Sequence, residues 1–202
     1  MYCSLGFILL LAAFHVSKPE IEPSWNFISE YETGKFGWIM QIAFFSLALS
    51  CIFLVIALWR PLNIAGKIGL MMLMITAAGM ILAAAYKTDP LNTPAALVTS
   101  AGKLHQTGAM LDQIPFAAIL ITIAIFRKKD WLVSRPLLII ALIAVWFGFI
   151  YFVGSVKVQF PADGKFGPNV TVGWQNRLMI VVQAVWLALV AKQSEPKKTA
   201  TS

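Results

Sequence analysis

Charged side chains are scarce in this sequence. They make up 12% of its 202 residues, whereas hydrophobic residues make up 59%. Soluble globular domains carry roughly a quarter charged residues. The shortage of charge therefore excludes an ordinary soluble domain, and no stretch is left that is long enough to form a separate one. The composition predicts an integral membrane protein.

Cysteine is also rare, with Cys3 near the start and Cys51 in the middle of an apolar run. If both runs are helices, the two thiols lie at different depths, which argues against a disulfide. No group of cysteines and histidines has the spacing of a zinc site, so no metal ligand is predicted. Strictly alternating apolar and polar residues are absent too, which excludes a transmembrane β-barrel.

Long apolar runs are what the sequence has instead. Runs of roughly 20 apolar residues cross a bilayer as helices, and six segments of this kind cover residues 2–16, 38–59, 68–86, 107–126, 132–153 and 172–191. We therefore predict an all-α integral membrane helix bundle with six transmembrane helices in residues 1–192, followed by a polar cytoplasmic tail in 193–202. Pro115 lies in the first half of the fourth segment and predicts a kink there.

The loops between these segments differ in charge. One set carries nine basic and two acidic residues, and the other set carries seven of each. The formal charge of +7 therefore belongs to one face, which the distribution of Lys and Arg assigns to the cytoplasm, with both termini inside. It predicts contact with anionic membrane lipids and gives no indication of nucleic-acid binding. The basic set is Arg60, Lys67, Arg127, Lys128, Lys129, Arg135, Lys192, Lys197 and Lys198, with Asp130 and Glu195.

The three loops on the opposite face are long, at about 20 residues each, and long loops carry function more often than short ones. Asp89 and Pro90 sit in one of them, where a turn that ends a helix explains them without any chemistry. Asp112 is more informative, because an acid inside a span normally faces a partner or a wet cavity. The candidate site residues on this face are Ser29, Glu30, Asp89, His105, Asp112, Gln175 and Arg177.

These residue types suggest two roles. Ser29 as nucleophile and His105 as base, oriented by Asp89 or Asp112, would form a catalytic group, although no nucleophile elbow is present. Glu30, Asp112, Gln175 and Arg177 would bind substrate. Arg177 could hold a phosphate or carboxylate, pair with Asp112 or Asp89, or extend to the membrane interface. His105 and Asp112 are seven residues apart, which places them on one helix face.

Several short pieces, taken in order, resemble the domain of unknown function 998 family of bacterial and archaeal membrane proteins. The pieces are Ser29 and Gly34, Thr88-Asp89-Pro90, Gly102 and His105, and Gly173 and Arg177. The resemblance covers most of the chain. It implies a multi-helix protein of the plasma (bacterial inner) membrane, and it implies no particular activity.

The preferred function is a pocket that recognises a lipid-like or small polar molecule, with an intramembrane hydrolase as its enzymatic form. Small residues in the spans suit an accessory or scaffold subunit of a larger membrane complex as an alternative. Asp112 suits a transporter of ions or small molecules. The cofactor stays open, because His15 and His105 lie at similar depths and two imidazoles can hold a haem iron. Membrane lipids, and other membrane subunits as an alternative, are the expected partners.

Overall fold

The computed structural model describes residues 1–162 and 164–197. Asp163 and residues 198–202 of the predicted tail lie outside the described residues. Within the described residues the chain is helical and forms no strand, apart from an isolated bridge between Trp131 and Pro196. The helices are α1 (Tyr2–Ser17), α2 (Gly37–Leu58), α3 (Ile64–Ala85), α4 (Ser100–Met110), α5 (Ile114–Phe126), α6 (Arg135–Gln159) and α7 (Val172–Gln193), with short 3-10 helices η1 (Ile28–Glu32) and η2 (Ala95–Leu97). The all-α prediction is confirmed.

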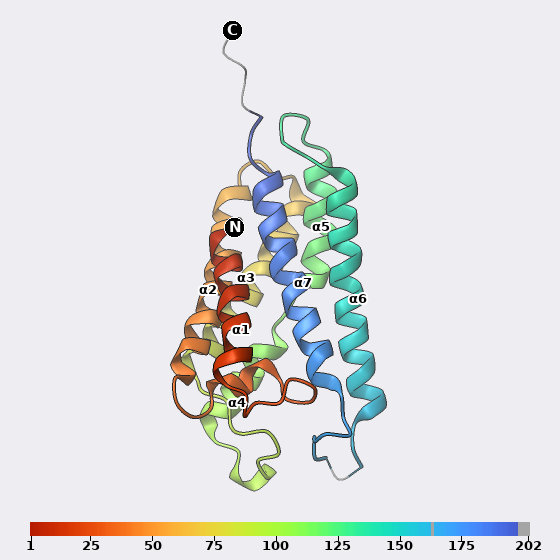
Figure 1. Ribbon diagram of the computed structural model, residues 1–202. Helices are drawn as coiled ribbons and strands as arrows, with labels where there is room; N and C mark the ends of the chain where they lie inside the picture. Colours follow the sequence, from red (N-terminus) through yellow and green to blue (C-terminus); the bar gives the residue numbers. More distant parts are fainter. Residues whose placement is uncertain (163, 198–202) are drawn as a thin grey trace.

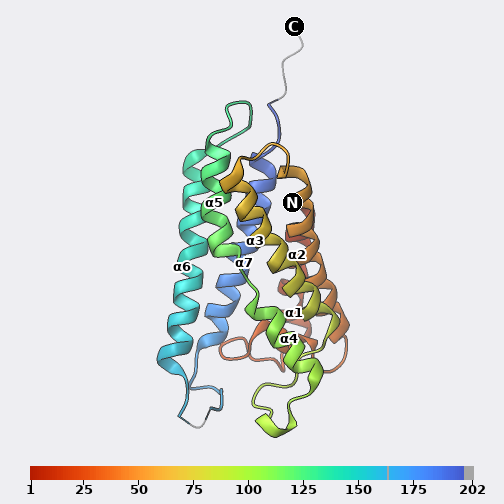
Figure 2. The ribbon, with the colours of Figure 1, turned by 180° about the vertical axis from the view of Figure 1, so that it is seen from behind.

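The long helices run up and down one elongated bundle (Figures 1 and 2). Five of them are long and apolar enough to cross a membrane, when α4 and α5 are taken together as Ser100–Phe126. α1 is apolar but has only 16 residues. The prediction of a multi-pass membrane protein is therefore confirmed in this coarser form.

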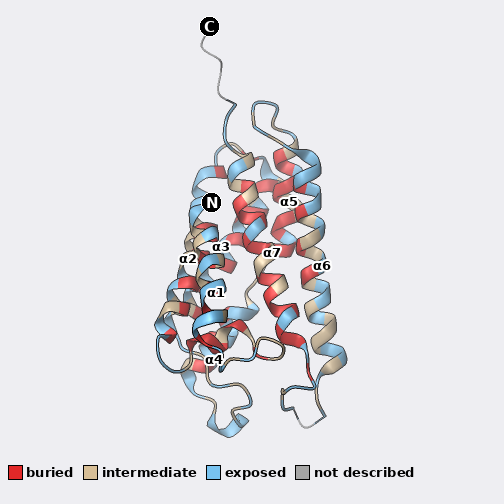
Figure 3. Cartoon of the chain, in the orientation of Figure 1, coloured by how far each residue is buried: buried red, intermediate tan, exposed pale blue. Residues whose placement is uncertain are grey.

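α7 occupies the centre of the bundle and is the most buried of the five candidate spans, whereas α6 is the least buried (Figure 3). Almost every position in these helices is apolar, so hydrophobic patterning does not decide which face packs inward. Where α3 meets α4, the inward face is instead decided by glycines that let the two backbones approach closely. A Cβ atom added to Gly79 of α3 would lie 2.4 Å from the Gly108 carbonyl oxygen of α4, and the reverse contact is equally short. Small residues of this kind let membrane helices approach each other closely.

The predicted kink near Pro115 is a complete break. α4 ends at Met110 and α5 begins at Ile114, with Pro115 in its first turn, where a missing N–H costs no hydrogen bond. Backbone groups exposed by such a break need partners inside a membrane. Thr76 Oγ1 accepts a hydrogen bond from Gln113 N at 2.8 Å, and Asp112 Oδ1 accepts one from Ile114 N at 2.9 Å.

The two ends of the bundle differ. The connections 59–63 and 127–134 and the C-terminal end of α7 lie at one end, which we call the basic end (Figure 1). The three long connections, which precede α2, α4 and α7, lie at the other end, which we call the loop end. The predicted site residues belong to the loop end and the adjoining helix turns.

Candidate functional site

The long connections at the loop end are joined to one another by specific hydrogen bonds. Asn92 and Phe166 exchange two hydrogen bonds of 2.7 Å, which tie the connection before α4 to the one before α7. Gly173 N donates to Ser24 O at 2.9 Å and ties α7 to the connection before α2. These contacts turn three separate loops into one platform beneath the helices.

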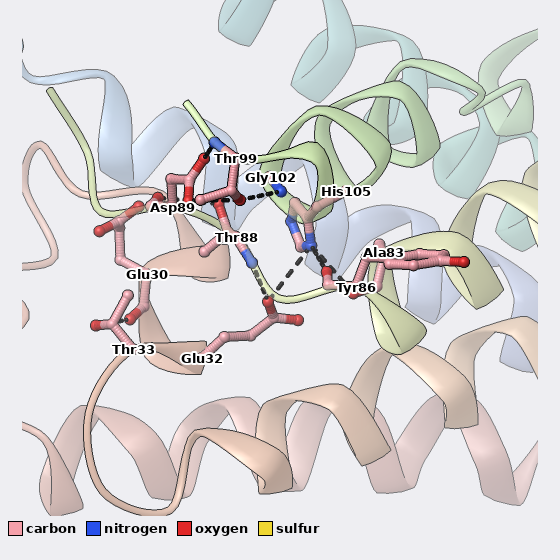
Figure 4. Close-up of polar contacts among 10 residues, drawn as sticks. All are labelled: Glu30, Glu32, Thr33, Ala83, Tyr86, Thr88, Asp89, Thr99, Gly102 and His105. Atoms are coloured by element: carbon pink, nitrogen blue, oxygen red, sulfur yellow. Dashed lines mark hydrogen bonds and ion pairs between the residues drawn. The ribbon is translucent and has the colours of Figure 1, made fainter. Parts of the chain in front are cut away.

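Two glutamates on η1 hold the segment between α3 and α4. Glu32 Oε2 accepts a hydrogen bond from Thr88 N at 2.9 Å (Figure 4). Glu30 Oε2 accepts one from Leu91 N at 3.0 Å. Both side chains are buried. Burial raises the pKa of Glu30, and it raises the pKa of Glu32 to about 8 against the opposing effects of Thr88 N–H and Lys87. These carboxyl groups therefore retain protons more readily than surface glutamates do.

Asp89 has a local role. Its carboxylate accepts hydrogen bonds from Thr99 N at 2.8 Å and Thr99 Oγ1 at 2.9 Å. Thr99 Oγ1 in turn accepts from Gly102 N at 3.0 Å and thereby caps the N-terminus of α4. The expectation that Asp89 orients His105 is wrong in this structure, because both Asp89 oxygens are bonded to Thr99.

His105 is 4% exposed and is oriented by the end of α3 and by η1. Its Nδ1 lies 3.0 Å from the carbonyl oxygens of both Ala83 and Tyr86, and 3.4 Å from Glu32 Oε2 (Figure 4). Three acceptors around one nitrogen require that Nδ1 carry the proton. No group among the described residues forms a hydrogen bond with Nε2. The neutral ring therefore has its free lone pair on Nε2, as a general base requires.

Ser29 and His105 line the same cavity, but they do not form a hydrogen bond. The Ser29 hydroxyl has no hydrogen-bond partner within the part of the chain that the structure describes. The Ser29–His105–Asp89 group is thus not assembled as a hydrogen-bonded triad. The structure instead joins His105 to Glu32.

The cavity has a volume of about 640 Å³ and lies between the loop end and the middle of the bundle. That volume is in the range of small-molecule sites. At the loop end its polar lining includes Glu30, Asp89, His105 and Asn176. The apolar walls come from four long helices and include Phe44, Met80, Phe149, Phe152, Val153, Val156, Met179 and Ile180.

Asp112 lies at the break between α4 and α5 and also lines the cavity. Its Oδ2 accepts a hydrogen bond from Gln183 Nε2 of α7 at 2.7 Å, and its Oδ1 accepts from Ile114 N. The carboxylate therefore joins the broken span to the central helix. His105 and Asp112 do not share one continuous helix, since α4 ends between them, but both border the same space.

Arg177 is buried and forms no contact with Asp112 or Asp89, so the predicted pairing is wrong. Its guanidinium donates to the carbonyl oxygens of Pro23, Asn26 and Gly173, to Tyr31 Oη at 3.2 Å and to His15 Nε2 at 3.0 Å. Neither Arg177 nor the neighbouring Gln175 lines the cavity. Arg177 therefore holds the connection before α2 against α7 and is not available to bind a substrate phosphate.

His15 is equally committed to the protein. Its Nε2 accepts the hydrogen bond from Arg177, which places the proton on Nδ1, and Nδ1 donates to Leu11 O at 2.8 Å. Neither nitrogen is free to bind iron. A haem held between His15 and His105 does not fit this arrangement.

Two residues of the site were not predicted from the sequence. Glu32 was given no role from the sequence, because its contact with His105 depends on two distant segments meeting. Asn176 lines the cavity and its Oδ1 accepts from Ile28 N at 3.0 Å. The "GWQNR" motif contained the signal, because three polar residues open a helix whose remainder is almost entirely apolar.

A family model described as Protein of unknown function (DUF998) matches residues 1–192, which is nearly the whole chain. The chain belongs to this family. Searches of curated proteins and of solved structures found no match. Most positions of the short pieces that carry the resemblance have a structural place in this DUF998 protein. Gly173 and Arg177 join the connection before α2 to α7, and Ser29, Thr88, Asp89, Gly102 and His105 border the cavity.

Proposed function

We propose that this protein binds an amphiphilic, lipid-like molecule in the cavity at its loop end. The observation that supports the proposal is the distribution of its lining. Polar groups from η1, the α3–α4 connection and α4 gather toward the loop end, and aromatic and aliphatic side chains from α2, α3, α6 and α7 line the rest. A headgroup would occupy the first region and an acyl or alkyl chain the second.

The packing of α4 supports entry of the ligand from the bilayer. α4 packs on α3, whereas α6 packs on α5 and α7, and no substantial contact joins α4 to α6 among the described residues. Both α4 and α6 nevertheless line the cavity. An amphiphile lying in the membrane could reach the cavity between these two helices.

The proposal includes an orientation in the membrane. We assign the basic end to the cytoplasm, with both termini inside, and the cavity to the opposite face of a bacterial inner membrane. α1 is then the sixth span, although 16 residues reach only about 24 Å and require local thinning of the bilayer. Labelling with a membrane-impermeant thiol reagent tests this orientation. In a protein whose native cysteines are replaced, Lys35→Cys should react in intact cells and Lys129→Cys only after lysis; the opposite pattern would invert the topology.

Binding is tested by filling the cavity. Ala109 is on α4 and lines the cavity, whereas Ala85 is exposed at the end of α3 and does not. Protein purified in mild detergent should carry an amphiphile detectable by native mass spectrometry. Ala109→Phe should lose it and Ala85→Phe should keep it. Equal retention by both variants would show that the molecule binds elsewhere, and a wild-type protein with no bound amphiphile would contradict the proposal.

Hydrolysis of the bound molecule is the second candidate, and the free Nε2 of His105 favours it. Two variants test the roles of the ring nitrogens separately. In His105→Asn the amide can replace Nδ1–H, and in His105→Gln the amide reaches toward the position of Nε2. If Nε2 acts as a base, His105→Asn should keep the fold and the bound ligand but lose turnover of p-nitrophenyl ester probes. Unchanged turnover would exclude a catalytic role for His105.

The scaffold and transport alternatives give different results in these experiments. A scaffold subunit would co-purify with other membrane proteins and would be insensitive to Ala109→Phe. A transporter would accumulate its ligand across proteoliposome membranes, with a rate that depends on Asp112. A stable monomer that binds an amphiphile and transports nothing supports the preferred function.

A further inference from the structure

The charged groups that line the cavity are of one sign. Glu30, Asp89 and Asp112 border it, and no lysine or arginine does so among the described residues. This is unusual in a chain whose formal net charge is +7. The basic residues are available to the protein, but they are kept away from this space.

Two buried side chains that line the cavity, Glu30 and His105, each leave one polar atom without a hydrogen-bond partner. Glu30 is 6% exposed, and only its Oε2 is used, by Leu91 N. His105 is 4% exposed, and only its Nδ1 is used. His105 Nε2 is a hydrogen-bond acceptor, and so is Glu30 Oε1 in the ionised carboxylate that a cationic ligand would stabilise. The amide nitrogen of Asn176 is the donor that accompanies them, since its Oδ1 is bonded to Ile28 N.

Neither Glu30 Oε1 nor His105 Nε2 is fully enclosed by the protein, so a ligand or water in the cavity can supply the donors that they lack. An anionic headgroup would bring more acceptors and would meet carboxylates instead of a cation. A protonated primary amine brings three donors and a positive charge, and so complements the acceptors of Glu30 and His105. Among the described residues no lysine or arginine lines the cavity, so the phosphate recognition considered for Arg177 has no cationic side chain here.

We infer that the natural ligand is an amphiphile with a positively charged amine headgroup, held at the loop end of the cavity by Glu30 and His105 with its alkyl chain among Phe149, Phe152 and Met179. This inference rests on the proposed amphiphile binding and narrows the class of ligand. The formal charge of +7 belongs to the basic end and the loop-end residues sum to zero, so selective binding of an amine would have to come from the site itself.

The test compares three probes with the same chain: dodecylamine, dodecanol and dodecanoate, measured by native mass spectrometry on wild-type protein. Dodecylamine should bind at least about tenfold more tightly than dodecanoate, which corresponds to about 1.4 kcal/mol. Dodecanol should bind with intermediate affinity. Glu30→Gln should remove most of the preference for the amine. The matched control is Glu20→Gln, which removes an exposed carboxylate outside the cavity lining and should leave the preference unchanged.

Each outcome distinguishes the inference from the function on which it rests. If dodecanol or dodecanoate binds as tightly as dodecylamine, the amine headgroup is wrong while amphiphile binding stands. If Glu20→Gln reduces the preference as much as Glu30→Gln does, the selectivity comes from general charge and the inference is overturned. If none of the three probes binds, amphiphile binding itself is wrong and the inference fails with it.

Discussion

The Asp89 carboxylate lies directly against the bare Cα of Gly102 in the first turn of α4. A Cβ atom added to Gly102 would come within 2.0 Å of Asp89 Oδ2. The contact lets Asp89 reach Thr99 and complete the cap that starts α4. Gly102 is therefore required by the approach of a neighbouring side chain and not by its own backbone conformation.

Gly102→Ala should destabilise the protein even though alanine is the better helix former. In an exposed helix the change would stabilise by about 1 kcal/mol. Here the new methyl group must displace Asp89 and break the cap, which costs about 1–2 kcal/mol for the cap alone. Thermal unfolding in detergent should show a lower Tm than wild type.

Gly154→Ala is the matched control for this change. Gly154 lies in α6, and an added Cβ would meet no atom within 4 Å. The Tm should stay the same or rise. A Tm for Gly102→Ala equal to or above that of wild type would show that Asp89 moves without cost and that the cap is dispensable.

Arg177→Lys should be strongly destabilising despite the retained charge. The guanidinium reaches three carbonyl oxygens, Tyr31 Oη and His15 Nε2, and a single ammonium group cannot replace a planar fork with five donors. Unpaired buried groups cost about 1–3 kcal/mol each, so the Tm should fall well below that of Arg60→Lys, which changes an exposed arginine at the basic end. Similar Tm values for the two variants would mean that the Arg177 cluster contributes little.

Glu32 should make stability depend on pH. Its pKa is about 8 in the folded protein against an ordinary value of 4.5. The folded state therefore holds a proton that the unfolded state has released, so the stability from this group is complete below about pH 4.5 and declines as pH rises toward 8. Glu30, whose pKa is also raised, contributes with the same sign, and Lys87 and His105 are the other titratable groups nearby.

Glu32→Gln should remove most of this decline, because the neutral amide keeps an oxygen for Thr88 N and has no proton to lose. The measurement is Tm at half-unit steps from pH 5 to 8.5 for wild type, Glu32→Gln and the exposed control Glu20→Gln. Parallel curves for wild type and Glu32→Gln would contradict the assignment, whereas Glu20→Gln should follow wild type.

The positions of the long helices could be predicted from the sequence, because runs of about 20 apolar residues have few other solutions in a bilayer. The predicted ends of these helices were less accurate. α3 begins at Ile64, where Asn63 caps it by accepting from Gly66 N at 3.0 Å, but the apolar run suggests a start at residue 68. α4 was missed, since residues 100–110 are too polar to resemble a span and their cap depends on Thr99.

The candidate site could be predicted only as a set of residues on one face. Asp89, His105 and Arg177 were selected as candidates, but their partners were not predicted. Those of His105 and Arg177 come from distant segments, and that of Asp89 depends on how its own connection folds. His105 meets Glu32 of η1, and Arg177 meets His15 of α1. Pairings of this kind depend on loop geometry, which neither apolar periodicity nor charge bias encodes.

The pair Asp112–Gln183 offers a test of the broken span. Asp112→Ala removes the acceptors of Ile114 N and Gln183 Nε2 at once, and leaves two buried donors unpaired. The expected loss is about 2–4 kcal/mol at membrane depth. Gln183→Leu alone leaves one carboxylate oxygen without its donor and should cost less, because the cavity beside Asp112 can admit water.

The double variant Asp112→Ala with Gln183→Leu should lose less stability than the two single variants lose together. It lacks both the Asp112 carboxylate and the Gln183 amide, so neither is left without its partner. Tm and unfolding in denaturing detergent should show a coupling of about 1 kcal/mol or more. Asp112→Ala combined with the distant Lys35→Ala should be additive. Additivity in the Gln183 pair as well would show that the 2.7 Å hydrogen bond between α7 and the break between α4 and α5 does not stabilise the bundle.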